Sequence, residues 1–146
     1  MILEKREIVI DEVTEPLSAV VDAAGVGEVL FGPPQPGTFW RVERLSVTSD
    51  SALASEARVY LGGAQPPNQV DMTLTGNDDT ADNSQPLWVP QGTELRVRWT
   101  GATAASNVHA RLHRRVCRYV SVPVDELTGQ PVVTVVDEPA ELVANT

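Results

Sequence analysis

Residues 85–103 have the sequence QPLWVPQGTELRVRWTGAT, which contains two of the three tryptophans of the chain. Within Glu94–Thr100, apolar residues alternate with charged or polar ones, which is the period of a half-buried β-strand. This alternation places Trp99 on the buried face. Leu87–Val89 is a second short strand candidate, and the Pro-Gln-Gly sequence between the two is typical of a tight turn. The stretch therefore predicts a β-hairpin in which Trp88, of opposite parity to its neighbours, is exposed.

Similar short segments recur along the chain, separated by turns rich in glycine and proline, such as GPPQPG at 32–37 and GGAQPP at 62–67. Regular spacing of this kind is typical of all-β sandwiches and barrels. The sequence therefore predicts an antiparallel β-sandwich of the jelly-roll or immunoglobulin-like type. The further strands are expected at Leu17–Asp22, Glu28–Phe31, Ala57–Leu61 and Val70–Thr75.

The apolar residues change parity within WRVERLSVTSD, residues 40–50. Trp40 and Val42 share one parity, whereas the later apolar residues of the segment have the other. A β-bulge near Glu43 and Arg44 would return both sets to one face, because a bulge inserts one extra residue into a strand. Trp40 is then expected in the core.

The segment NVHARLHRRVCRYVSVPV, residues 107–124, fits two periods. Val108, Leu112 and Val116 are spaced for one face of a helix, but they also share a face of a strand. The β-branched content and the hairpin-like TGATAASN before it favour the strand. We expect a final long strand here and keep the helix as the alternative.

Charge is unevenly distributed along the 146 residues, whose net charge is −9. Residues 1–40 carry seven acids and two bases (−5), residues 41–118 eight acids and nine arginines (+1), and residues 119–146 five acids and no base (−5). The two acidic ends contain strand-forming runs, EIVIDEV at 7–13 and Val132–Val136. We predict extended arms at 1–15 and 123–146, flanking a sandwich body at 16–122.

No catalytic motif is present, so we expect no enzymatic activity and no cofactor. On a strand His109 and His113 would be about 13 Å apart, too far to share a metal. The single cysteine, Cys117, excludes an internal disulfide, and neither a signal peptide nor a membrane helix is expected. The loop at 75–85 is interpreted as a polar turn, with Asn77, Asp79 and Asp82 as candidate Ca²⁺ ligands.

Arginines cluster late in the chain, but a sequence pI near 4.6 and 5% aromatic residues argue against nucleic-acid binding. Arginine pairs well with carboxylates at interfaces, so the acidic arms of this or a neighbouring copy are the expected partners, with ordinary surface solvation as the alternative. The basic stripe consists of Arg111, Arg114, Arg115 and Arg118, and Arg96 and Arg98 are expected on a neighbouring strand. The candidate subunit-interface residues are Ile8, Ile10, Arg111, Arg114, Arg115, Arg118, Val133 and Val135.

Two runs, GTFWRVERLSVTSDSALASEARVYLGG and GNDDTADNSQPLWVPQGTELRVRWTGAT, resemble small β-sandwich structural proteins of tailed bacteriophages that infect actinobacteria. The resemblance covers residues 37–103. It implies a non-enzymatic virion component, assembled in the host cytoplasm, such as a capsid decoration protein or a minor tail or fibre-associated protein. The implied partners are further copies of the chain, for example in a trimer, and the major capsid protein. A carbohydrate-binding module with Trp88 in its site is the alternative from another class.

Overall fold

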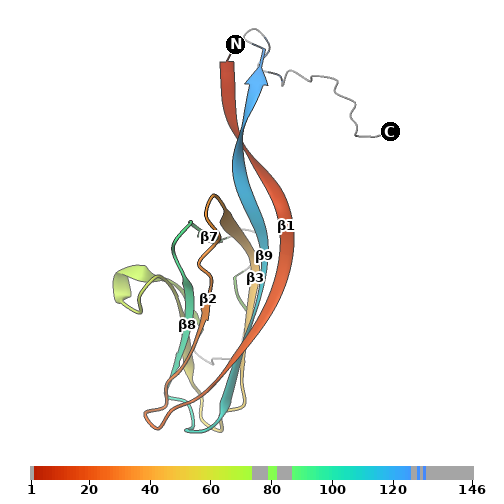
Figure 1. Cartoon of the computed structure of the whole chain (residues 1–146). Helices are drawn as coiled ribbons and strands as arrows, with labels where there is room; N and C mark the ends of the chain where they lie inside the picture. Colours follow the sequence, from red (N-terminus) through yellow and green to blue (C-terminus); the bar gives the residue numbers. More distant parts are fainter. Residues whose placement is uncertain (1, 74–78, 82–86, 126–127, 129, 131–146) are drawn as a thin grey trace, which may run out of the picture. The chain divides into compact units, whose positions relative to one another are not determined.

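The computed structural model describes residues 2–73, 79–81, 87–125, 128 and 130 (Figure 1). These residues form nine β-strands and one short 3₁₀ helix. No helix among these residues is long and apolar enough to cross a bilayer. The elements are β1 (Ile2–Val20), β2 (Gly27–Phe31), β3 (Phe39–Ser49), β4 (Glu56–Leu61), η1 (Pro66–Asn68), β5 (Gln69–Thr73), β6 (Asp79–Ala81), β7 (Leu87–Val89), β8 (Leu95–Thr100) and β9 (Asn107–Val124).

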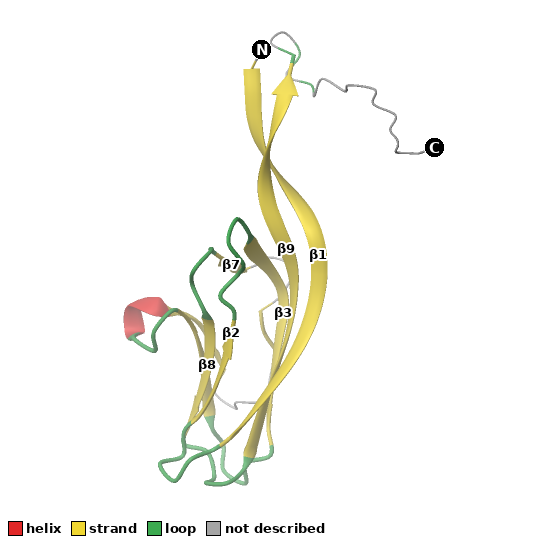
Figure 2. Cartoon of the chain, viewed as in Figure 1, coloured by secondary structure: helices red, strands yellow, loops and turns green. Residues whose placement is uncertain are grey.

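The chain divides into two compact units, residues 8–118 and residues 1–7 with 119–146. The unit of residues 8–118 contains two β-sheets (Figure 2). The five-stranded sheet has the order β1-β9-β3, with β6 and β7 both on the far side of β3, and the four-stranded sheet has the order β2-β8-β4-β5. The predicted all-β antiparallel sandwich is confirmed.

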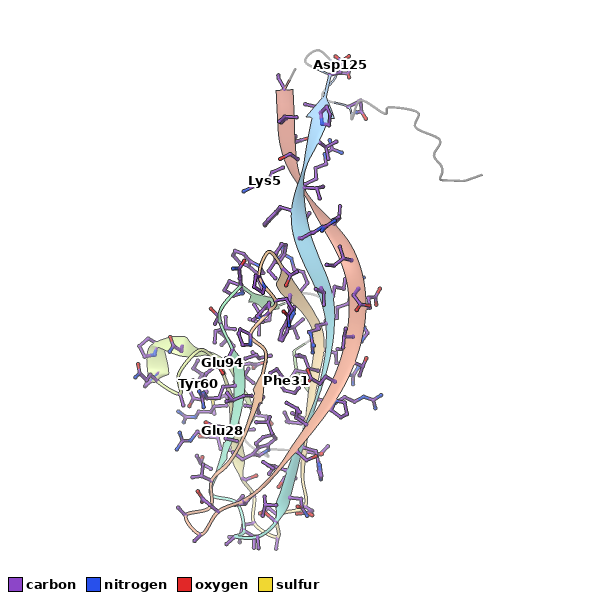
Figure 3. All side chains as sticks on the ribbon, viewed as in Figure 1. Lys5, Glu28, Phe31, Tyr60, Glu94 and Asp125 are labelled. Carbon is purple, nitrogen blue, oxygen red and sulfur yellow. The ribbon has the colours of Figure 1, made fainter. Side chains whose placement is uncertain are left out.

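Side chains from both sheets make a single core. Trp99 on β8 is fully buried, and Phe31 on β2 is fully buried in the same core (Figure 3). Trp40 is buried and Trp88 is 48% exposed, so the predicted positions of all three tryptophans are confirmed. The fully buried large side chains are Trp99, Phe31, Leu45, Leu95, Leu112, Val42, Val47, Val59, Val89, Val97, Val108 and Cys117.

The predicted hairpin between β7 and β8 is wrong. β7 pairs with β3 in the five-stranded sheet, whereas β8 lies between β2 and β4 in the other. A turn closed by the hydrogen bond from Thr93 N to Pro90 O (3.2 Å) carries the chain from one sheet to the other. Residues 101–106 likewise connect β8 to β9 across the sandwich. A short Pro-Gly turn fits a sheet-to-sheet corner as well as a hairpin, and only the distant partner strands decide between them.

The predicted bulge is confirmed. β3 pairs antiparallel with β9, and the register slips between Val42, opposite Arg114, and Arg44, opposite His113. Glu43 is therefore the extra residue, and the apolar residues on both sides of it face the core. Because a bulge re-aims the side chain it inserts, it also directs the Glu43 carboxylate toward β9.

The segment 107–124 is a strand, and the helical alternative is wrong. β1 runs as one strand of 19 residues from the predicted N-terminal arm into the predicted strand at 17–22, and it ends at Val20. Thr14 meets His113 and Ser18 meets His109, so β1 and β9 run antiparallel. β1 ends the strand order of its sheet, and an edge strand tolerates a proline such as Pro16.

Two hydrogen bonds between Asp50 and Asn107 stabilise one end of the β3–β9 pair. The Asp50 carboxylate accepts hydrogen bonds from the backbone N–H of Asn107 (2.6 Å) and from its side-chain amide (3.1 Å). These bonds, the backbone one first, lower the pKa of Asp50 below its ordinary value of 3.8. A lowered pKa stabilises the fold at pH values above that ordinary value, and the contribution is lost as the pH falls through the folded-state pKa.

The unit of residues 1–7 and 119–146 contains the first residues of β1 and the last residues of β9. The Lys5 ammonium lies 5.5 Å from the centroid of the Tyr119 ring, and Arg6 pairs with Glu4 at 2.7 Å. The Asp125 N–H donates to Gln130 O at 2.9 Å. The predicted strand at 132–136, with Val133 and Val135, lies outside the described residues, as do Asn77 and Asp82.

Candidate functional site

The four arginines of the predicted basic stripe differ in their contacts: Arg114 and Arg115 form ion pairs within the chain. Arg114 is 11% exposed, its Nη1 lies 2.9 Å from Glu15 Oε1, and its guanidinium lies 4.0 Å from the centroid of the Trp40 ring. Arg115 Nε lies 2.6 Å from Glu43 Oε2. Arg114 and Arg115 therefore have carboxylate partners within one copy, and Glu15 belongs to the predicted N-terminal arm.

The remaining arginines of the stripe, Arg111 and Arg118, are exposed, and no described residue forms an ion pair with either of them. Arg111 lies opposite Ser46, next to the pair formed by Arg44 and His113. The three basic side chains, with Thr14 and Ser46, line a pocket of about 260 Å³. Arginine and hydroxyl groups are donors, so the pocket suits a carboxylate or another anion.

Sequence reasoning did not include Arg44 in this pocket, because the parity of residues next to a bulge cannot be assigned without the partner strand. It also placed Arg96 and Arg98 beside the stripe, which is wrong. Both belong to β8 in the other sheet, where Arg96 Nη1 pairs with Glu28 Oε1 at 2.6 Å.

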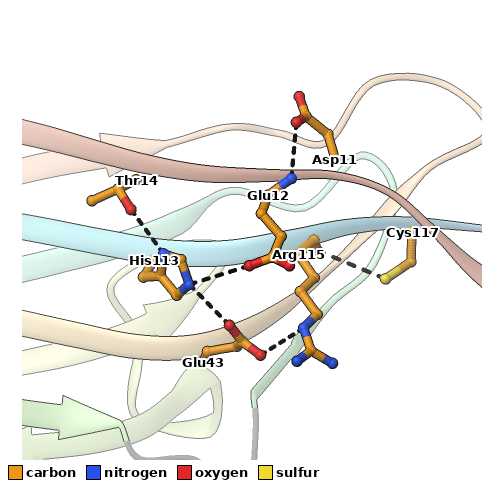
Figure 4. Close-up of polar contacts among 7 residues, drawn as sticks. All are labelled: Asp11, Glu12, Thr14, Glu43, His113, Arg115 and Cys117. Carbon is orange, nitrogen blue, oxygen red and sulfur yellow. Dashed lines mark hydrogen bonds and ion pairs between the residues drawn. The ribbon is translucent and has the colours of Figure 1, made fainter.

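His113 connects the basic pocket to a group of carboxylates (Figure 4). Its Nδ1 lies 2.8 Å from the Thr14 hydroxyl. Its Nε2 lies 2.9 Å from Glu43 Oε1 and 3.7 Å from Glu12 Oε1. These contacts bring together β1, β9 and β3, although the two glutamates are 31 residues apart in the sequence. The predicted bulge is the sequence signal that could have indicated Glu43. No comparable signal marks Glu12.

A second hollow, of about 590 Å³, is lined by residues of β1, β3 and β9 and of the connection between β2 and β3. It is lined by ten residues that include both Glu15 and Arg114, together with Trp40, Gly32 and Pro33. The Nε of Arg114 is buried without a hydrogen-bond partner. Because acidic and basic groups both line it, its charge does not indicate one class of ligand.

The edge strand β1 carries exposed apolar side chains within the unit of residues 8–118. Val9, Ile10 and Val20 are exposed, and Ile8 is half-buried. An edge strand has a row of backbone groups that no strand pairs with, which makes it a template for another strand. Among the described strands only β9 neighbours β1.

Trp88 is the exposed aromatic residue of β7. Its ring meets that of Phe39 edge to face, with centroids 6.0 Å apart, and the Arg41 guanidinium lies 5.8 Å from its centroid. Tryptophan with a neighbouring arginine is a surface on which a planar or sugar ring could stack.

Comparison of the chain with known protein families, with curated proteins and with solved structures finds no match.

Proposed function

We propose that this chain is a non-enzymatic structural protein of a tailed bacteriophage virion, specifically a capsid decoration protein that joins neighbouring subunits. The resemblance of residues 37–103 to such proteins supports the proposal, and the antiparallel sandwich to which β3–β8 of this range contribute is compatible with it. A cement protein needs a rigid body and a means of joining other subunits. The observation that carries the proposal is the edge strand β1, with its exposed apolar residues.

Strand addition is the proposed means of joining. An incoming strand can pair with the backbone of β1, and its side chains can cover Val9 and Ile10. The basic pocket around Arg111 offers a place for carboxylates of the acidic ends, which carry −5 at residues 119–146. Exposed ion pairs of this kind contribute more to register and partner choice than to affinity.

Loss of the oligomer is expected when β1 loses its apolar surface. If the chain forms a trimer, light scattering should give a mass of about 47 kDa, three times the 15.7 kDa of one chain. We expect Val9→Lys to shift the mass toward the monomer, because a lysine on an edge strand opposes pairing. Val70→Lys, at an exposed valine on β5 at the edge of the other sheet, is the matched control and should leave the mass unchanged. The opposite pattern would move the interface away from β1.

Location in the particle is tested by immunogold electron microscopy of virions from the phage that encodes the chain. Gold on the capsid surface is the expected result. Gold confined to the tail would replace decoration by the minor tail or fibre-associated role. Virions without any label would contradict both virion roles.

One observation favours a function of another class. Trp88 is exposed between Arg41 and Phe39, which is the arrangement expected of a carbohydrate-binding module. Its partner would be a glycan rather than a particle, and binding would depend on Trp88 rather than on Val9. We place this second because the aromatic surface rests on one exposed ring.

A further inference from the structure

We propose that Glu12, Glu43 and His113 bind a divalent transition-metal ion, for which Zn²⁺ is the best chemical match. The three ligand atoms, His113 Nε2 and one carboxylate oxygen of each glutamate, all lie within 4.8 Å of one another (Figure 4). The proposal rests on side chains within one copy and does not depend on the virion role, although His113 also lines the basic pocket.

The spacing of the ligand atoms fits a small ion. Zinc binds nitrogen and oxygen at about 2.0–2.2 Å, so two ligands of a tetrahedral site lie roughly 3.3–3.6 Å apart. The distances from His113 Nε2 to Glu43 Oε1 (2.9 Å) and to Glu12 Oε1 (3.7 Å) lie on either side of that value. The Glu12 side chain is 56% exposed, so it can rotate to shorten its distance to the other two ligands. Water can provide a fourth ligand.

Two outer contacts orient the ligands as they do in known zinc sites. A ligating histidine usually donates its other ring N–H to an oxygen, and His113 Nδ1 lies 2.8 Å from the Thr14 hydroxyl. Ligating carboxylates are also held by hydrogen bonds, and Arg115 Nε lies 2.6 Å from the second oxygen of Glu43. Arg115 leaves the first oxygen of Glu43 directed at His113.

The choice of ion follows from the ligand types. An imidazole with two carboxylates suits Zn²⁺ and similar transition metals, whereas Ca²⁺ and Mg²⁺ prefer oxygen ligands alone. The three ligands come from β1, β9 and β3, so the ion would connect the edge strand to two strands of its sheet. Metal binding would therefore stabilise the docking of β1.

The chain contains a matched control for the histidine. His109 lies on the same strand, and its Nδ1 meets the Ser18 hydroxyl of β1 at 2.7 Å, as His113 meets Thr14. Within the described residues no carboxylate forms an ion pair with His109. The two histidines thus share the hydroxyl contact with β1 but differ in the carboxylates at Nε2.

The test is titration of the tag-free full chain with ZnCl₂ by calorimetry and by thermal unfolding. We expect one ion per chain and a rise of about 5 °C or more in Tm when free zinc is 100 times its Kd. His113→Gln and Glu43→Gln should each lose at least about tenfold in affinity, and His109→Gln should bind as the wild type does. Thr14→Val should weaken binding about tenfold, since it removes the outer contact of His113.

Three results would overturn the site. One is that the wild-type chain shows no saturable zinc binding below about 1 mM, which corresponds to about −4 kcal/mol. A second is equal loss of affinity in His109→Gln and His113→Gln. Glu12→Gln keeps the test valid if the Glu43 or His113 variant fails to fold, because Glu12 is largely exposed. Retention of full affinity in Glu12→Gln, Glu43→Gln and His113→Gln would likewise place the ion elsewhere.

Discussion

Replacement of Trp99 by alanine is expected to lower the free energy of unfolding by about 3–5 kcal/mol, the usual cost of removing a large buried aromatic side chain. Trp99 is fully buried on the central strand β8, between Gly27 on β2 and Ala57 on β4. Both partners are small residues, so they cannot expand to fill the space that the indole leaves. The result would be a cavity between the sheets and a fold close to the limit of stability of a small domain.

Trp88→Ala is the control for this substitution. Trp88 is exposed, and its main contacts are the edge of Phe39 and the Arg41 guanidinium. Loss of contacts of this kind costs about 1 kcal/mol or less. Urea unfolding followed by circular dichroism measures both variants, because the midpoint and slope give the free energy directly. Similar losses in the two variants would mean that the indole of Trp88 is packed in solution.

Alternation alone predicted most of the strands and the side of each tryptophan. The pattern of Leu95, Val97 and Trp99 needs no knowledge of the partner strand, since successive side chains of any strand point to opposite faces. The bulge at Glu43 could be predicted for the same reason. When both halves of one apolar run face the same core, a change of parity between them requires an inserted residue.

Pairing between strands could not be predicted in this way. The same Pro-Gln-Gly turn ends a hairpin or a sheet-to-sheet corner, and Val89 opposite Trp40 is a contact between residues 49 apart in the sequence. The candidate site depends on such pairings. Arg44 meets His113, and Arg114 lies opposite Val42, only because the bulge sets the register. A stripe of four arginines in the sequence therefore became two that pair with carboxylates of the same chain and two that form no ion pair with a described residue.

The ion pair between Glu15 and Arg114 is expected to respond asymmetrically to loss of its two members. Glu15→Gln should cost about 2 kcal/mol, because it leaves a guanidinium that is 11% exposed, with an Nε that already lacks a partner, without its counterion. Arg114→Met should cost less, about 1 kcal/mol. The methionine can still cover Trp40, and the Glu15 carboxylate, at 36% exposed, can return to water.

The double variant Glu15→Gln/Arg114→Met makes the test a thermodynamic cycle. The cost of Glu15→Gln is expected to come from an unpaired buried charge. Removing Arg114 as well should then restore about 1 kcal/mol of the free energy of unfolding, so that the double variant unfolds at a higher urea concentration than Glu15→Gln alone. Glu56→Gln, which breaks the more exposed pair with Arg58, should change the urea midpoint little. A double variant less stable than either single one would show that the two side chains act independently, and that Arg114 is held by Trp40 rather than by Glu15.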